Sequence, residues 1–201
     1  DIILVPVNIL VSADDEVSLL AFSLRVKEEL ARVIPKDSCC QLAELSALIH
    51  MDGALQIHGQ AELTLEILTE NAAAARKIFH LVKNLFHSET EILVRKKRRL
   101  RKNNVYGIRI PAGAEVREIL LKLGLVDEDF ALVQGISPPL VKRKCCRRAY
   151  LRGAFLGKGS ITDPEKTYHL EFTVDNPVYA GDLNRLLHSQ GVPARVSERK
   201  K

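Results

Sequence analysis

The residues best suited to chemistry form a basic stretch, with seven Lys or Arg in the eight positions 95–102. Alternate side chains of a β-strand project from one face, so a strand here aligns several cations. Such a row on a β-ribbon suits phosphate contacts in a nucleic-acid groove. A solvated hairpin with a protective basic edge is the alternative, but the number of charges favours nucleic acid. The predicted contact residues are Arg95, Lys97, Arg98, Arg99, Arg101 and Lys102.

A second basic cluster precedes and enters a predicted helix near residue 145. Positive charge at a helix N-terminus opposes the helix dipole, which mildly favours an anionic partner. Contact with a DNA backbone and a solvated helix start both remain open for it. The cluster consists of Lys142, Arg143, Lys144, Arg147, Arg148 and Arg152, of which we select Arg143, Arg147 and Arg148 as candidate contacts.

The four cysteines form two vicinal pairs, Cys39-Cys40 and Cys145-Cys146. Adjacent cysteines rarely bridge to each other, and zinc sites more often show spaced pairs such as C-x-x-C. Buried free thiols are therefore preferred over a metal site, and we predict neither a metal nor a cofactor. The pairs are more useful as markers of an internal repeat.

The repeat joins each cysteine pair to an apolar helix that ends in glycine. Cys39-Cys40 precedes Leu45–Gly53 by the same spacing as Cys145-Cys146 precedes Leu151–Gly159. Downstream, 65–67 (Leu-Glu-Ile) matches 170–172 (Leu-Glu-Phe), and a helix follows each. The chain therefore reads as one complete α-β-β-α-β-β-α unit and about half of a second.

Hydrophobic periodicity positions the elements. It predicts a helix from Ser18 to Pro35, the motif helix to Gly53, a helix over 71–86 and a short helix over 116–123. Strands are expected at 55–57, 63–67, 91–101 and 105–110, then a helix to about Ser189 and a strand from Ala194. The expected domains are an N-terminal extension of unclear role (1–20), a first half (21–125), a linker (126–144) and an incomplete second half (145–201).

Composition is that of a globular protein, with 201 residues, 46% hydrophobic and 27% charged, and a net charge of +5. The longest apolar start, 2–11, is far short of the roughly 20 residues of a membrane span, and no basic region precedes it as in a signal peptide. We expect a cytoplasmic, nucleoid-associated protein without membrane contact.

Paired helices ending in glycine, each leading a β-β-α unit, resemble the LAGLIDADG pattern of homing endonucleases. The segments Phe22–Arg32, Cys39–Gly53 and Arg147–Phe155 resemble the WhiA family of bacterial sporulation and cell-division regulators. The resemblance implies an α+β fold with two helices at a pseudo-twofold axis and two saddle-shaped sheets that enter the DNA major groove. It also implies that a helix-turn-helix domain should follow residue 201. Double-stranded DNA is the expected partner, with other transcription regulators or RNA polymerase as further ones.

The resemblance places a metal-binding carboxylate of the nucleases at Asp52, and cleavage needs such an acid from each helix. Lys158 occupies the matching position in the second copy, and lysine cannot bind a hard cation. We therefore expect a degenerate, non-enzymatic scaffold in which Asp52 is a helix-terminal residue that can pair with Lys158. An active endonuclease, and a protein-interaction module whose missing helix-turn-helix binds DNA, are the alternatives.

Overall fold

The computed structural model describes residues 2–4, 13–58, 62–96, 104–163 and 169–197. Its first half contains β1 (Ile2–Leu4), α1 (Ala13–Arg32), α2 (Ser38–Asp52), β2 (Gly53–His58), β3 (Glu62–Thr69), α3 (Ala72–Phe86), β4 (Glu91–Lys96), β5 (Asn104–Ile110) and α4 (Ala114–Lys122). A 3₁₀ turn, η1 (Pro138–Val141), leads to α5 (Lys144–Lys158), β6 (Gly159–Ile161), β7 (Leu170–Thr173), α6 (Pro177–His188) and β8 (Arg195–Ser197).

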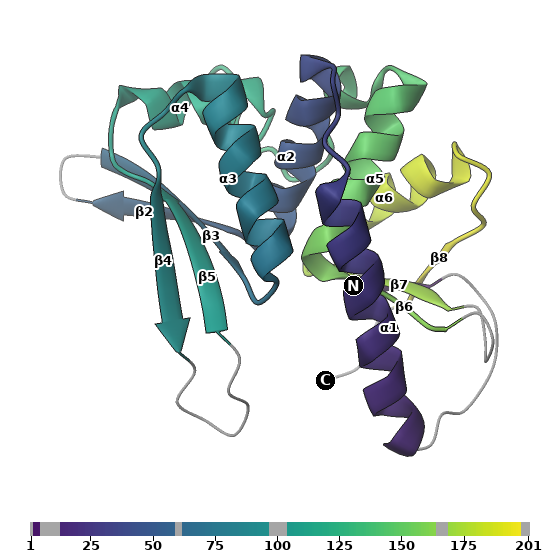
Figure 1. Ribbon diagram of the computed structural model, residues 1–201. Helices are drawn as coiled ribbons and strands as arrows, with labels where there is room; N and C mark the ends of the chain where they lie inside the picture. The colour runs from purple at the N-terminus through teal and green to yellow at the C-terminus, as the bar shows by residue number, and fades with distance from the viewer. Residues whose placement is uncertain (1, 5–12, 59–61, 97–103, 164–168, 198–201) are drawn as a thin grey trace.

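Two antiparallel four-stranded sheets flank a central pair of helices, α2 and α5 (Figure 1). One sheet has the strand order β2-β3-β5-β4 and the other has the order β6-β7-β1-β8. The two orders correspond strand for strand, with β1 from the start of the chain in the place that β5 takes in the first sheet. The predicted α+β fold, a LAGLIDADG-like pseudo-twofold repeat, is thereby confirmed.

The central helices approach closely because α5 carries glycine where it crosses α2. Both helices are 15 residues long and both end at a glycine, Gly53 or Gly159, in extended conformation. A Cβ atom added at Gly153 would collide with the carbonyl oxygen of Glu44, and one at Gly157 would lie 2.7 Å from Met51 Cβ. Larger residues at these two positions would force the helices apart.

Local sequence signals explain the flanking helices and strands. Asn71 caps α3 by accepting from the backbone N–H groups of Ala73 (2.8 Å) and Ala74 (3.0 Å), and Asn176 caps α6 in the same way. Alternation along β3 directs Leu65 and Ile67 into the core beneath α3.

Some predicted boundaries were wrong. The first long helix begins at Ala13 rather than Ser18, so the segment 1–20 contains β1 and the first turns of α1. The acidic residues 14–16 at this start are a helix N-terminal signal that the apolar periodicity alone does not carry. The segment 126–144, predicted as a linker, contains a β-bridge between Val126 and Leu132 and the turn η1.

Candidate nucleic-acid interface

The sheet β2-β3-β5-β4 packs one face into the core, and the opposite face, which the described helices do not cover, is called the open face. Leu65, Ile67, Ile108 and Ile110 are buried on the core face. Alternation and the strand register place several polar and charged side chains on the opposite face, where Leu68 and Leu93 also lie beside Gly107. This open face carries Gln56, Glu66, Glu91, Arg95 and Arg109.

Arg95 is held in place on the open face but keeps its charge in solvent. Its Nη2 donates to Glu66 Oε1 at 3.1 Å, and its side chain remains 63% exposed. Gln56 Nε2 donates to the other oxygen of Glu66 at 3.2 Å. Glu66 thus orients Arg95 as well as offsetting its charge, and the face is mixed in charge rather than uniformly basic.

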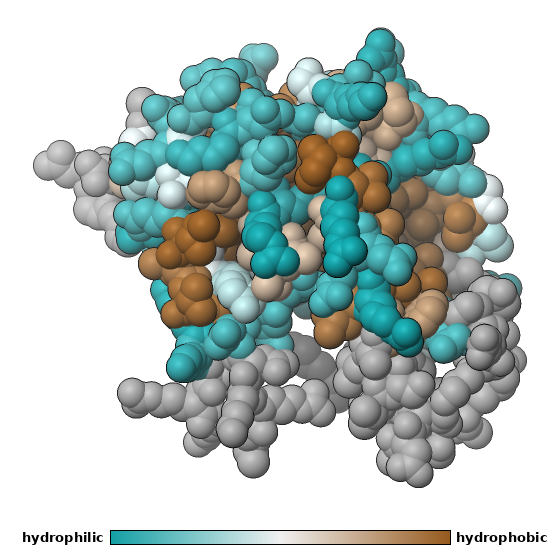
Figure 2. Space-filling model, in the orientation of Figure 1, coloured by the Kyte–Doolittle hydropathy of each residue, from teal (hydrophilic) through white to brown (hydrophobic). Residues whose placement is uncertain are grey.

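The two faces of β4 differ in chemistry. Ile92 and Val94 point away from the Arg95 side and are 56% and 57% exposed. Figure 2 shows apolar side chains gathered over the lower part of this sheet. The predicted contact residues Lys97, Arg98, Arg99, Arg101 and Lys102 lie outside the described residues.

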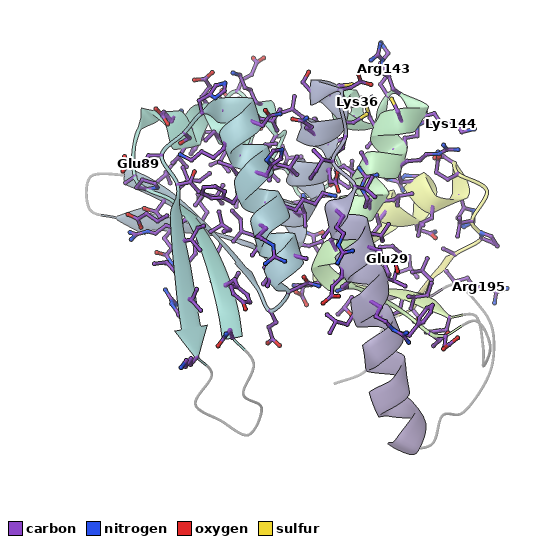
Figure 3. The ribbon with its side chains drawn as sticks, in the orientation of Figure 1. Glu29, Lys36, Glu89, Arg143, Lys144 and Arg195 are labelled. Atoms are coloured by element: carbon purple, nitrogen blue, oxygen red, sulfur yellow. The ribbon has the colours of Figure 1, made fainter. Side chains whose placement is uncertain are left out.

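The second basic cluster lies at the other end of the molecule. Arg143, Arg147 and Arg148 stand at the start of α5, whereas the sheets join its far end (Figures 1 and 3). A 15-residue helix is about 22 Å long, so these residues do not share a surface with the β4–β5 hairpin. Arg147 Nε donates a hydrogen bond to the carbonyl oxygen of Val141 at 2.9 Å. The side chains of Arg143 and Arg148 are exposed.

Asp52 and Lys158 are the last residues of α2 and α5, the positions at which the two helices converge on the sheets. Lys158 Nζ forms an ion pair with Asp175 Oδ2 at 3.2 Å rather than with Asp52, although its charge acts on Asp52 from nearby. A second lysine approaches from α1, because Lys27 Nζ donates to the carbonyl oxygen of Gly157 at 3.1 Å. The end of the helix pair thus holds Asp52, the two cations Lys158 and Lys27, and the Asp175 carboxylate that pairs with Lys158.

Burial raises the pKa of Asp52 to about 6, and the nearby charges of Lys158 and Lys27 oppose that rise. Burial lowers the pKa of Lys27, with Asp52 acting in the other direction. A groove of about 1400 Å³ reaches Asp52 from the side of α1 and α3. Among the described residues, a divalent cation beside Asp52 would meet the ammonium groups of Lys158 and Lys27, and Lys158 already pairs with the nearby carboxylate of Asp175, so the site is unfavourable for a hard metal.

A buried ionic cluster joins three helices near the middle of α2. Arg152 binds both carboxylate oxygens of Glu44 through Nε (2.8 Å) and Nη2 (2.6 Å). Lys77 pairs with the same carboxylate and donates to the carbonyl oxygens of Leu30 (3.0 Å) and Val33 (2.7 Å) at the end of α1. Arg152 is therefore a structural residue, not part of the exposed basic cluster in which the sequence placed it.

His50 is a packed histidine. Its ring stacks on Tyr179 with centroids 3.9 Å apart. Burial lowers its pKa to about 4, and a backbone hydrogen bond with Gln134 opposes this. The ring is neutral near pH 7 and takes no part in a charged site.

Sequence comparison agrees with this arrangement of two related halves. The family model described as the WhiA N-terminal LAGLIDADG-like domain matches residues 38–126, and the WhiA LAGLIDADG-like domain matches 147–201. The chain belongs to the WhiA family. It is 55% identical over 182 residues to a probable cell division protein WhiA from Desulforamulus reducens, and 52% identical over 183 residues to one from Heliobacterium modesticaldum. Each match covers 90% of this chain but 56% or 57% of the relative, so the chain spans about half the length of these WhiA proteins.

Solved structures support the fold. The N-terminal LAGLIDADG domain of DUF199/WhiA matches with a TM-score of 0.65 and 24% identity, over 89% of this chain and 79% of that one. A structure of I-DmoI in complex with its target DNA matches with a TM-score of 0.52 and 14% identity, over 79% and 80% of the two chains. WhiA and a homing endonuclease therefore share the architecture found here.

Among the described residues of this WhiA-family chain, the helices are all too short or too polar to cross a membrane.

Proposed function

We propose that this chain is a non-cleaving, double-stranded-DNA-binding part of a WhiA-family transcription regulator. The observation that carries the proposal is the charge at the end of the helix pair. Lys158 stands where a second acid would be needed, and Lys27 adds another cation beside Asp52. Two-metal or shared-metal hydrolysis needs carboxylates from both sides of the scissile phosphate, and this site supplies one.

DNA contact is assigned to the basic hairpin between β4 and β5. Arg95 supports this assignment, because it is exposed on the open face and oriented by Glu66. The charge density of 95–102 suits phosphate neutralisation along a groove. A relative of this fold, I-DmoI, is recorded in complex with its target DNA.

The relatives are named probable cell division protein WhiA, which supports a regulatory role in cell division. We propose a role in the regulation of sporulation as well. In this proposal the halves 21–125 and 145–201 form two arms on either side of α2 and α5, and the protein acts at the nucleoid. Other transcription regulators or RNA polymerase are further partners of the whole protein.

Incubation with supercoiled plasmid in the presence of Mg²⁺ or Mn²⁺ tests the non-cleaving part of the proposal. We expect retarded migration without nicked or linear product over a range of protein concentrations. Metal-dependent nicking that disappears in Asp52→Asn would contradict the proposal and support an endonuclease. A protein-interaction module is the alternative if duplex DNA is not bound even at low salt.

A further inference from the structure

The four cysteines converge although they come from two distant parts of the sequence. Cys40 Sγ lies 3.9 Å from Cys146 Sγ, which in turn lies 4.0 Å from Cys145 Sγ. The sulfur atoms of Cys39, Cys40 and Cys146 are all within 4.8 Å of one another. Figure 3 shows sulfur atoms at the upper ends of α2 and α5, near Arg143.

The convergence follows from the internal repeat. Cys39 and Cys145 are the second residues of α2 and α5, and Cys40 and Cys146 are the third. Because the helices pack about a pseudo-twofold axis, equivalent residues near their starts face each other across it. Cys40 and Cys146 are such a pair, 106 positions apart in the chain.

From this geometry we propose that Cys39, Cys40, Cys145 and Cys146 bind one thiophilic divalent cation of the zinc class. Zinc–sulfur bonds of about 2.3 Å in a tetrahedron place neighbouring sulfurs about 3.8 Å apart. The Cys40–Cys146 and Cys145–Cys146 separations of 3.9 and 4.0 Å are close to that edge, whereas Cys39 and Cys145 fall in two different groups of ligand atoms within 4.8 Å and must approach each other to complete the tetrahedron. A disulfide would join only two of the four sulfurs, with an S–S bond of about 2 Å, which is much shorter than these separations.

A single ion fits the cluster better than an iron–sulfur centre does. Such a centre places iron and sulfide between its cysteines, which spreads the cysteine sulfurs beyond the separations of ligands that share one ion. Among the described residues, Asp37 is the competing ligand, because its carboxylate lies within 4.8 Å of the sulfurs of Cys40 and Cys145. Zinc in structural sites prefers sulfur and nitrogen ligands, so we assign the four thiolates.

The surroundings can offset the negative charge of four thiolates. The four cysteines lie in the first turns of α2 and α5, and helix N-termini favour anions. Arg143 Nη1 lies 3.6 Å from Cys39 Sγ and donates to it. The second basic cluster thus has a use that requires no DNA.

A cation here would clamp the starts of α2 and α5 together. The proposed DNA face lies at the opposite end of the same helices (Figure 1). The inference is therefore independent of the proposed function, and each can fail without the other. Each thiol that binds the cation releases its proton to solvent.

Metal content and cobalt spectroscopy of the tag-free protein test the inference. We expect about one zinc per chain in protein purified under reducing conditions. After removal of zinc, one equivalent of Co²⁺ should produce the visible bands of a tetrahedral thiolate site. Cys40→Ser and Cys146→Ser should lose these bands, and Asp37→Asn should keep them. Circular dichroism checks that the serine variants are folded.

A thiol-reactivity measurement on the wild-type protein avoids any dependence on variants that fold. Bound zinc should protect all four thiols from a disulfide reagent, and a chelator should restore their reactivity. Sub-stoichiometric metal with no cobalt bands would overturn the proposal. So would a Cys40–Cys146 disulfide in the reduced preparation, or loss of the bands in Asp37→Asn.

Discussion

Asp52 and Lys158 end two helices of equal length and equivalent position, and they carry opposite charges. The two side chains do not pair with each other, because Lys158 bonds to Asp175 and Asp52 is partly buried beside Gly157. The backbone is thus pseudo-twofold symmetric, but the two equivalent side chains carry opposite charges at the point where a symmetric nuclease site would lie. This asymmetry is the basis of the non-cleaving function proposed above.

The raised pKa of Asp52 gives a pH-dependent prediction. Its folded-state pKa of about 6 exceeds the reference value of 3.8, so the folded state binds the proton more tightly. This contribution to the free energy of unfolding is present below pH 4 and is lost as pH rises through about 6. Asp52→Asn should therefore stabilise the protein by about 1–2 kcal/mol at pH 8 and change little at pH 4.

Chemical denaturation at both pH values measures this effect. The matched control is Asp129→Asn, at an exposed position, which should stay within about 0.5 kcal/mol of wild type. The prediction is contradicted if Asp52→Asn is less stable than the wild type at pH 8 and if Mg²⁺ stabilises the wild type and so widens that difference. Asp52 would then be a carboxylate that binds metal.

The helix crossing predicts a large difference between two mid-helix glycines. Gly153→Ala should destabilise the protein by about 1–3 kcal/mol, because the new methyl group meets the backbone of α2 at Glu44. Gly181→Ala on α6 should be neutral or stabilising by up to about 1 kcal/mol, since only Arg185 Nη1 lies near, at 3.6 Å. Thermal or denaturant unfolding compares the two, and equal effects would contradict the close packing of α2 on α5.

The buried carboxylate of Glu44 predicts a second contrast. Glu44→Gln leaves Lys77 and Arg152 without their shared anion, so the free energy of unfolding should fall by about 3–5 kcal/mol. Glu118→Gln breaks the exposed pair with Lys122 and should cost less than about 0.5 kcal/mol. Similar losses in the two variants would show that the Glu44 cluster is solvated in solution.

Much of the scaffold was predictable because its signals are local. The Asn71 cap, the alternation of β3 and the glycine-terminated helices all act within a few residues of sequence. The repeat also predicted that Lys158 would occupy the position equivalent to Asp52, which the two 15-residue helices confirm.

The side-chain roles that were missed depend on contacts between distant segments. Arg152 looked like another exposed cation, and only the crossing of α5 over α2 brings it to Glu44, 108 residues away. The cysteine pairs lacked a C-x-x-C spacing, and it is the pseudo-twofold that joins them. The repeat itself held a usable signal, because residues at the starts of two paired symmetric helices must meet.

The salt dependence of duplex binding tests the central claim most directly. Loss of four cations in Arg95/Lys97/Arg99/Arg101→Ala should weaken binding at low salt and flatten the plot of log K against log salt by about 0.9 per phosphate contact removed. The matched control, Lys36/Lys142/Lys144/Arg148→Ala, removes four exposed cations from the opposite end and should leave the slope nearly unchanged. Equal slopes for wild type and the hairpin variant, or an equal loss in both variants, would contradict the assignment of DNA binding to the β4–β5 hairpin.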